Sequence, residues 1–118
     1  MKYEIWDVVF THFPNQEDRS VTTARIALII DDIGDKFTLC PFTKQLNKET
    51  YYKYTIRIEK ESEEGRAMNL DYTSILIFDR LFDMPKYLMI KKTGTCPDTL
   101  IEKIEALLEK MKEDGKYL

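Results

Sequence analysis

Two side chains near the ends of predicted strands have the right types to bind a phosphate. Arg25 stands where a polar segment enters an apolar run, and Thr43 follows Cys40-Pro41-Phe42 at the end of the next predicted strand. Neighbouring antiparallel strands place the start of one beside the end of the other, so we expect Arg25 and Thr43 on one rim of the sheet. Arginine donates two parallel hydrogen bonds to a phosphate, and a threonine hydroxyl donates one. The alternative is a surface arginine and a turn threonine with no shared role.

Other common catalytic arrangements have little support in the sequence. The chain has a single histidine, His12, so a mechanism with two histidines is excluded, and we expect His12 to be structural or simply exposed. Asp31 and Asp32 are adjacent in a predicted turn, where such pairs are usually only solvated. No glycine-rich phosphate loop and no Cys/His cluster with zinc spacing occurs. The sequence therefore predicts neither a metal nor a cofactor.

The charge distribution limits how the chain could bind nucleic acid. A formal net charge of −3 at pH 7 argues against binding through bulk charge. Residues 44–60 are nevertheless positive, with five basic and two acidic side chains. This stretch is either a nucleic-acid contact or a solvated strand face. The candidates for substrate contacts in this stretch are Lys44, Lys53 and Arg57. The stretch also contains Tyr51, Tyr52 and Tyr54. These tyrosines either stack on bases or belong to the core and a dimer interface.

Strand patterns occupy most of the chain before residue 92. Strands are predicted at 3–13, 25–30, 36–42, 51–59, 73–82 and 87–91. The polar segment 15–24 is predicted to be a loop, long enough to suggest a functional role. Turns are predicted at 31–35 and 61–66. The apolar run 75–82, together with Tyr52 and Tyr54, exceeds what one helix can cover, which predicts a homodimer.

The C-terminal segment predicts an amphipathic helix. Its apolar stripe consists of Leu100, Ile101, Ile104, Leu107, Leu108 and Met111. Thr95 and Asp98 have the spacing of a capping box, with Pro97 in the first turn, and Gly115 marks the end. Several strands followed by one helix predict a mainly β fold, a small curved sheet or barrel that the helix covers.

Length and composition fit one domain over residues 1–118. The two cysteines, Cys40 and Cys96, form no CxxC pair and predict reduced thiols. No apolar run approaches the length of a membrane span, and the first residues lack the apolar core of a signal peptide. We therefore expect a cytoplasmic protein without a membrane partner.

Five short motifs occur in a fixed order along the chain. They are WDVVFTHFP at 6–14, RIALII at 25–30, CPFT at 40–43, TSILIFD at 73–79 and KTGT at 92–95. In this order they resemble the motifs of the MazF/PemK family of toxins from type II toxin–antitoxin systems. Trp6 stands where the family typically has glycine, Ile26 stands where it has proline, and Ile77 stands where some members have arginine.

The resemblance implies an SH3-like β-barrel with a C-terminal helix, usually a homodimer. It implies a metal-independent endoribonuclease that cleaves single-stranded RNA, with a cognate antitoxin as its inhibitor. By motif match, the arginine of the family falls on Arg25 and its threonine or serine on Thr43. Glu17 is the nearest acidic counterpart in the polar loop. Two alternatives stay open, a toxin of the same fold that acts on a protein such as DNA gyrase, and a catalytically inactive binding module.

Overall fold

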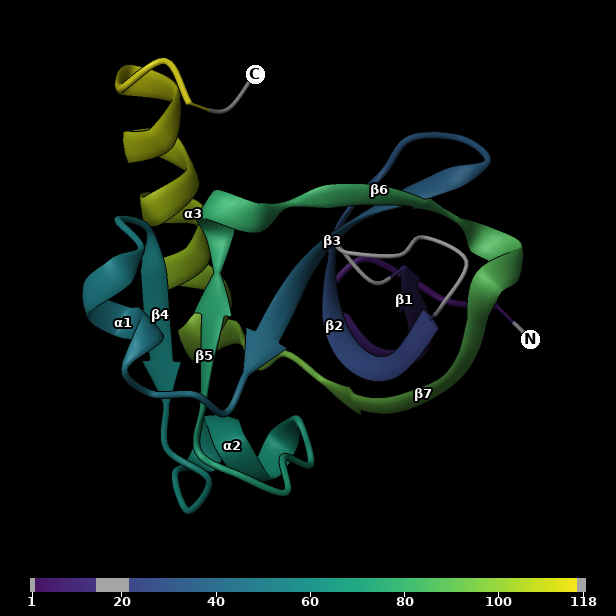
Figure 1. Ribbon diagram of the computed structural model, residues 1–118, viewed down its shortest axis with the longest axis horizontal. Coiled ribbons are helices and arrows are strands. Elements are labelled where there is room, and N and C mark those ends of the chain that lie inside the picture. The colour runs from purple at the N-terminus through teal and green to yellow at the C-terminus, as the bar shows by residue number, and fades with distance from the viewer. Residues whose placement is uncertain (1, 15–21, 117–118) are drawn as a thin grey trace.

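The protein is built on one antiparallel sheet (Figure 1), described in a computed structural model that covers residues 2–14 and 22–116. The strands among these residues are β1 (Asp7–Pro14), β2 (Thr22–Asp32), β3 (Lys36–Thr43), β4 (Thr55–Ile58), β5 (Ser74–Ile77), β6 (Phe82–Pro85) and β7 (Met89–Thr95). Their order in the sheet is β4-β5-β3-β2-β1-β7, and β6 pairs with β3 beside this path.

Short helices connect the strands and one long helix follows them. The helices of the described segments are α1 (Lys48–Tyr51), α2 (Glu63–Ala67), α3 (Asp98–Glu113) and the 3-10 helices η1 (Phe78–Arg80) and η2 (Lys86–Leu88). Residues of α3 pack with β4 and β5 in one hydrophobic cluster. None of the described helices is long and apolar enough to cross a membrane.

The predicted fold class, mainly β with a C-terminal helix, is confirmed. Closure into a barrel is not, because the strand order is an open path in which no recorded pairing joins β4 to β7 within the described residues. The strand β3 explains the curvature of the sheet. Lys36–Leu39 pairs with β6 on one edge, whereas Phe42 and Thr43 pair with β5. One strand therefore connects two differently oriented parts of the sheet.

Strand alternation divides the core into two clusters. Side chains with period two point to opposite faces, so Val8 and Leu28 enter one cluster while Val9 and Ile29 enter the other. The first cluster lies between the sheet and α3. The second, which we call the inner cluster, comprises Val9, Ala27, Ile29, Phe37, Leu39, Met84 and Met89.

Several predicted boundaries are wrong for local reasons. The first strand begins at Asp7, because Trp6 has a φ of 77° and the chain turns there. The second begins at Thr22, since β1 pairs as far as Pro14↔Thr22, which shortens the predicted loop. The predicted turn at 31–35 also contains the end of β2, which extends to Asp32.

Three further segments differ from their predictions. The strand predicted at 51–59 is limited to Thr55–Ile58, because α1 occupies the residues before Tyr52. The turn predicted at 61–66 is mostly α2, whose cap is Ser62, with Oγ accepting from the Gly65 N–H at 3.0 Å. The strand predicted at 73–82 is interrupted by η1. The strand predicted at 87–91 begins only at Met89, because η2 precedes it.

The C-terminal helix is confirmed as α3, with its apolar stripe buried or half-buried. The predicted capping box is wrong, because Pro97 is the N-cap and no side chain caps it. The predicted stop is confirmed. Gly115 has a φ of 72°, its N–H donates to the Lys112 carbonyl, and the Lys116 N–H donates to the Met111 carbonyl, as in a Schellman motif.

Candidate functional site

Arg25 lies inside β2 and not at its start. It is exposed and pairs with Thr11 of β1, whose side chain is fully buried and donates a hydrogen bond to the Leu88 carbonyl at 2.9 Å. Alternation along β2 puts Arg25 on the same face as Ala27 and Ile29, both in the inner cluster. The guanidinium therefore extends from the solvent-facing end of an otherwise apolar face.

Thr43 is the last residue of β3 and is half-buried. Alternation places it on the face of Leu39, which is also the inner-cluster face. Its Oγ accepts a hydrogen bond from the Gln45 N–H at 3.1 Å. The threonine proton is thus available for donation, while the oxygen already fixes the turn after the strand.

The strand register sets Arg25 and Thr43 opposite each other, but the two residues are not themselves paired. The last recorded pair between β2 and β3 at this end is Ala27↔Pro41, so the same register continued by two residues sets Arg25 opposite Thr43. Beyond Pro41, however, β3 pairs with β5. Arg25, inside β2, and Thr43, at the end of β3, therefore share one face in a region where the two strands no longer pair, and their predicted closeness stays a prediction.

Arg57 lies on the same side of the sheet as Thr43. The recorded pairs Thr43↔Ile75 and Arg57↔Ile75 set the three residues in a row across β3, β5 and β4. Two strand spacings separate the outer members by about 10 Å. The Arg57 Nε donates to the Glu59 carboxylate at 2.9 Å, so part of its charge is already neutralised.

The two lysines proposed from sequence lie in different surroundings. Lys44 follows Thr43 directly, is exposed, and has its Nζ 4.6 Å from the ring centroid of Tyr72. Lys53 precedes β4, and its Nζ lies 3.8 Å from the Asp114 carboxylate at the C-terminal end of α3. The structure therefore keeps Lys44 beside Thr43 and directs Lys53 elsewhere. Glu17 lies outside the described residues.

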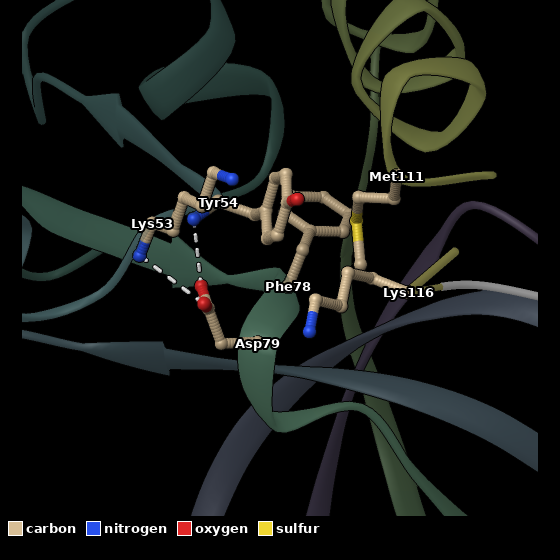
Figure 2. Close-up of a pocket in the computed structure, with 6 residues that line it drawn as sticks. All are labelled: Lys53, Tyr54, Phe78, Asp79, Met111 and Lys116. Carbon is tan, nitrogen blue, oxygen red and sulfur yellow. Dashed lines mark hydrogen bonds between the residues drawn. The ribbon is translucent and has the colours of Figure 1, made fainter. Parts of the chain in front are cut away.

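Figure 2 shows the pocket to which Lys53 belongs. It has a volume of about 340 Å³ and is lined by Lys53, Tyr54, Phe78, Asp79, Met111 and Lys116. The Asp79 carboxylate in this pocket accepts hydrogen bonds from the backbone N–H groups of Lys53 at 3.1 Å and Tyr54 at 2.7 Å. Asp79 ends the fourth sequence motif, and its contacts here fix a turn of the backbone.

A second contact joins this pocket to the end of α3. The Tyr54 hydroxyl donates to the Asp114 carboxylate at 2.6 Å. This bond is the main cause of a lowered pKa of Asp114 and a raised pKa of Tyr54. The pair fastens the last turn of the helix to the residue just before β4.

The cysteines are buried and offer no reactive group. Burial raises the pKa of the Cys40 thiol well above its usual range and raises the pKa of Cys96 to about 12. On the surface, the Lys86 ammonium lies 2.7 Å from Asp32, and their hydrogen bond lowers the pKa of that carboxyl. Across residues 2–14 and 22–116, no three His, Cys, Asp or Glu side chains are grouped as metal ligands would be.

Most of the apolar residues from which the sequence predicted a homodimer are covered within the chain. Tyr54 is only 4% exposed, and the run from Ile75 to Phe78 is buried against the sheet and α3. That sequence argument is therefore wrong, because it counted the residues of a central strand as uncovered surface. The sequence pattern also missed Tyr72, because only the tertiary fold brings this exposed ring to Lys44.

Comparison with known proteins identifies one family. Residues 4–111 match the model of a family described as PemK-like, MazF-like toxin of type II toxin-antitoxin system. No curated protein matches the chain.

Proposed function

The chain belongs to the family of PemK-like, MazF-like toxins of type II toxin–antitoxin systems, and from that premise we propose that it is an endoribonuclease that cleaves single-stranded RNA. The observation that carries the proposal is the family match over residues 4–111. Its family-derived pair, Arg25 and Thr43, lies on one face of the sheet and has the chemistry to bind a phosphate.

The proposed reaction is a transesterification. The 2′-hydroxyl of one nucleotide attacks the adjacent phosphorus, the bond from phosphorus to the 5′-oxygen breaks, and a 2′,3′-cyclic phosphate and a 5′-hydroxyl are formed. The 2′-hydroxyl loses its proton and the 5′-oxygen gains one, so atoms balance without a co-reactant. No metal and no cofactor takes part in this scheme.

Arg25 and Thr43 have different roles in this scheme. The guanidinium of Arg25 stabilises the negative charge that grows on the phosphate oxygens in the transition state. Thr43 donates its hydroxyl proton to a non-bridging oxygen and holds the phosphate in line for attack. The bond from the Gln45 N–H to Thr43 Oγ favours this role, because it occupies an acceptor site and orients the hydroxyl.

The substrate contacts follow the face of the sheet. Lys44, directly after Thr43, and Arg57, two strands away from Thr43, supply positive charge, and the Tyr72 ring next to Lys44 offers a surface for an unpaired base. Lys53 contributes at most long-range attraction, since its ammonium lies beside Asp114. Glu17 remains a candidate from sequence alone.

We also propose that residues 1–118 act as one cytoplasmic domain that forms a homodimer and is inhibited by a cognate antitoxin. Family membership supports each of these statements. The sequence argument from buried tyrosines and apolar strands does not.

A cleavage assay tests the proposed reaction. We expect the purified protein to cut single-stranded RNA in the presence of EDTA and to leave a 2′,3′-cyclic phosphate and a 5′-hydroxyl. An oligonucleotide with one 2′-deoxy residue on the 5′ side of the scissile bond resists cleavage there, because the nucleophile is missing. Cleavage at the deoxy position contradicts the mechanism. Absence of any RNA cleavage, with toxicity retained on expression, indicates a protein-directed toxin instead.

A further inference from the structure

An exposed tyrosine, a half-buried tyrosine and basic side chains gather at α1, outside the proposed reaction site. Tyr51 is 76% exposed, and the Lys48 Nζ lies 5.3 Å from its ring centroid. The rings of Tyr51 and Tyr52 meet edge to face at 4.9 Å, and the Arg80 Nη1 donates to the Tyr52 hydroxyl at 3.4 Å. We call Lys48, Tyr51, Tyr52 and Arg80 the α1 surface.

Hydrogen bonds of the backbone fix the chain at the end of α1 and in the residues that follow. The Tyr52 N–H donates to the Lys48 carbonyl at 3.1 Å, which closes the last turn of α1. The next two N–H groups, of Lys53 and Tyr54, donate to the Asp79 carboxylate, as Figure 2 shows. Because these bonds fix the backbone around Tyr51, little order has to be gained when a partner binds there.

We infer that the α1 surface binds single-stranded RNA beside the cleavage position, an inference that rests on the proposed function. An unpaired base stacks on the exposed Tyr51 ring, and Lys48 and Arg80 supply positive charge for the neighbouring phosphates. A flat aromatic surface next to cations fits single-stranded nucleic acid, which offers ring faces and phosphates in alternation. Two acids lie nearby. Glu49 of α1 offsets part of the positive charge, whereas Asp79 detracts little, because its carboxylate already accepts two backbone N–H groups.

The α1 surface lies within reach of the proposed reaction site. Lys48 follows Thr43 by five positions, and a chain of that length spans no more than about 18 Å. A few nucleotides of extended single strand cover this distance. One RNA strand can therefore contact Thr43 through a phosphate and Tyr51 through a base.

Fluorescence anisotropy measures this contact separately from cleavage. The probes are fluorescein-labelled oligoadenosine and oligouridine with 2′-O-methyl groups, which lack the nucleophile and stay intact. We expect Tyr51→Ala to weaken binding of both about tenfold, since stacking tolerates any base. Tyr51→Phe keeps the ring and should bind like the wild type. Tyr87→Ala is the matched control, because Tyr87 is 83% exposed but lies on η2.

Salt dependence provides a second readout. Removing one phosphate contact with Lys48→Ala should reduce the slope of log affinity against log salt by about 0.7. Equal affinities of Tyr51→Ala and the wild type, with an unchanged slope for Lys48→Ala, would overturn the inference and leave the proposed function intact. A wild type that neither binds nor cleaves single-stranded RNA refutes both. If Tyr51→Ala changes the sedimentation coefficient but not RNA affinity, the surface joins two copies of the chain, and the RNA assignment is wrong.

Discussion

Arg25 and Thr43 differ in their structural roles in the fold. The exposed guanidinium of Arg25 lies on a face whose neighbours are apolar, whereas Thr43 also fixes a turn through the Gln45 N–H. Substitution of Arg25 should therefore affect chemistry almost alone. Substitution of Thr43 should affect chemistry and, to a small degree, stability.

For Arg25, we expect Arg25→Ala to lower the initial rate of RNA cleavage by at least about a hundredfold, because transition-state charge loses its partner. Arg25→Lys should recover little, since a point charge cannot donate two parallel hydrogen bonds. Arg66→Ala is the control, because Arg66 is an exposed arginine of α2. Unchanged thermal melting of all three variants separates catalysis from folding. Full activity in Arg25→Ala excludes the proposed role.

For Thr43, the informative comparison is Thr43→Val against Thr43→Ser. Valine keeps the shape but removes the hydroxyl, so kcat should fall, and stability should drop by about 1 kcal/mol as the Gln45 N–H loses its acceptor. Serine keeps both bonds and should retain most activity. Denaturant melts and single-turnover rates measure the two effects separately. A stability loss without any change in rate identifies Thr43 as a turn residue only.

At the scale of elements, two contacts tie parts of the chain that are far apart in sequence. The Tyr54 hydroxyl binds Asp114 across 60 residues, and Asp79 holds the turn before β4. A close approach of backbones provides another tie. A Cβ on Gly94 of β7 would lie 2.4 Å from the Met68 carbonyl oxygen. The contact between Tyr54 and Asp114 and the close approach at Gly94 each lead to a prediction about stability.

The contact between Tyr54 and Asp114 predicts a pH dependence. Asp114 has a lowered pKa in the folded state, so its contribution is present above the unfolded pKa of about 3.9 and is lost as pH falls through the folded value. The raised pKa of Tyr54 acts at the other end, so the contribution is lost as pH rises through the folded value, above about 10. Tyr54→Phe should therefore destabilise the protein at neutral pH, with a difference that shrinks in acid.

Urea unfolding of the wild type and Tyr54→Phe at a series of pH values measures this difference. Tyr52→Phe is a suitable control, since Tyr52 neighbours Tyr54 in sequence but bonds Arg80. A difference between the wild type and Tyr54→Phe that stays constant down to acid pH would show that the hydroxyl acts without the Asp114 charge.

Gly94 should tolerate no side chain. We expect Gly94→Ala to cost about 1–3 kcal/mol, because the methyl group meets backbone atoms of Met68 that cannot rotate away. Thr95→Ala is the control, since Thr95 is exposed and next in the same strand. Thermal or urea melts compare the two variants. Equal stability of Gly94→Ala and the wild type would mean that β7 moves freely relative to Met68.

At the scale of the whole molecule, family membership favours the homodimer that we propose. Sedimentation velocity at micromolar concentration should give the mass of two chains, 14.0 kDa each. The exposed apolar side chains available for an interface include Leu88 and Ile90, at 36% and 43%, whereas Tyr54 and β5 are covered. Ile90→Asp tests that face. A monomeric wild type contradicts the proposed dimer.

Local patterns in the sequence determined the elements that depend on neighbours along the chain. The stripe from Leu100 to Met111 predicts α3 because helical spacing alone gathers those side chains on one face. The run 25–30 predicts a buried strand because every residue after Arg25 in it is apolar, and β2 contains this run. The sequence also identifies Arg25 and Thr43 as candidates, since residue type and order are enough for a motif match.

Only the tertiary structure decided what distant residues do to one another. The strand predicted at 73–82 ends at Ile77 because η1 follows, where the Asp79 carboxylate accepts N–H groups from residues 53 and 54. Lys53 lies beside Asp114 and Lys44 lies over Tyr72, although both lysines belong to one positive stretch. Periodicity describes which face a residue takes, but the partner on that face depends on contacts formed by chain segments that the local pattern does not contain.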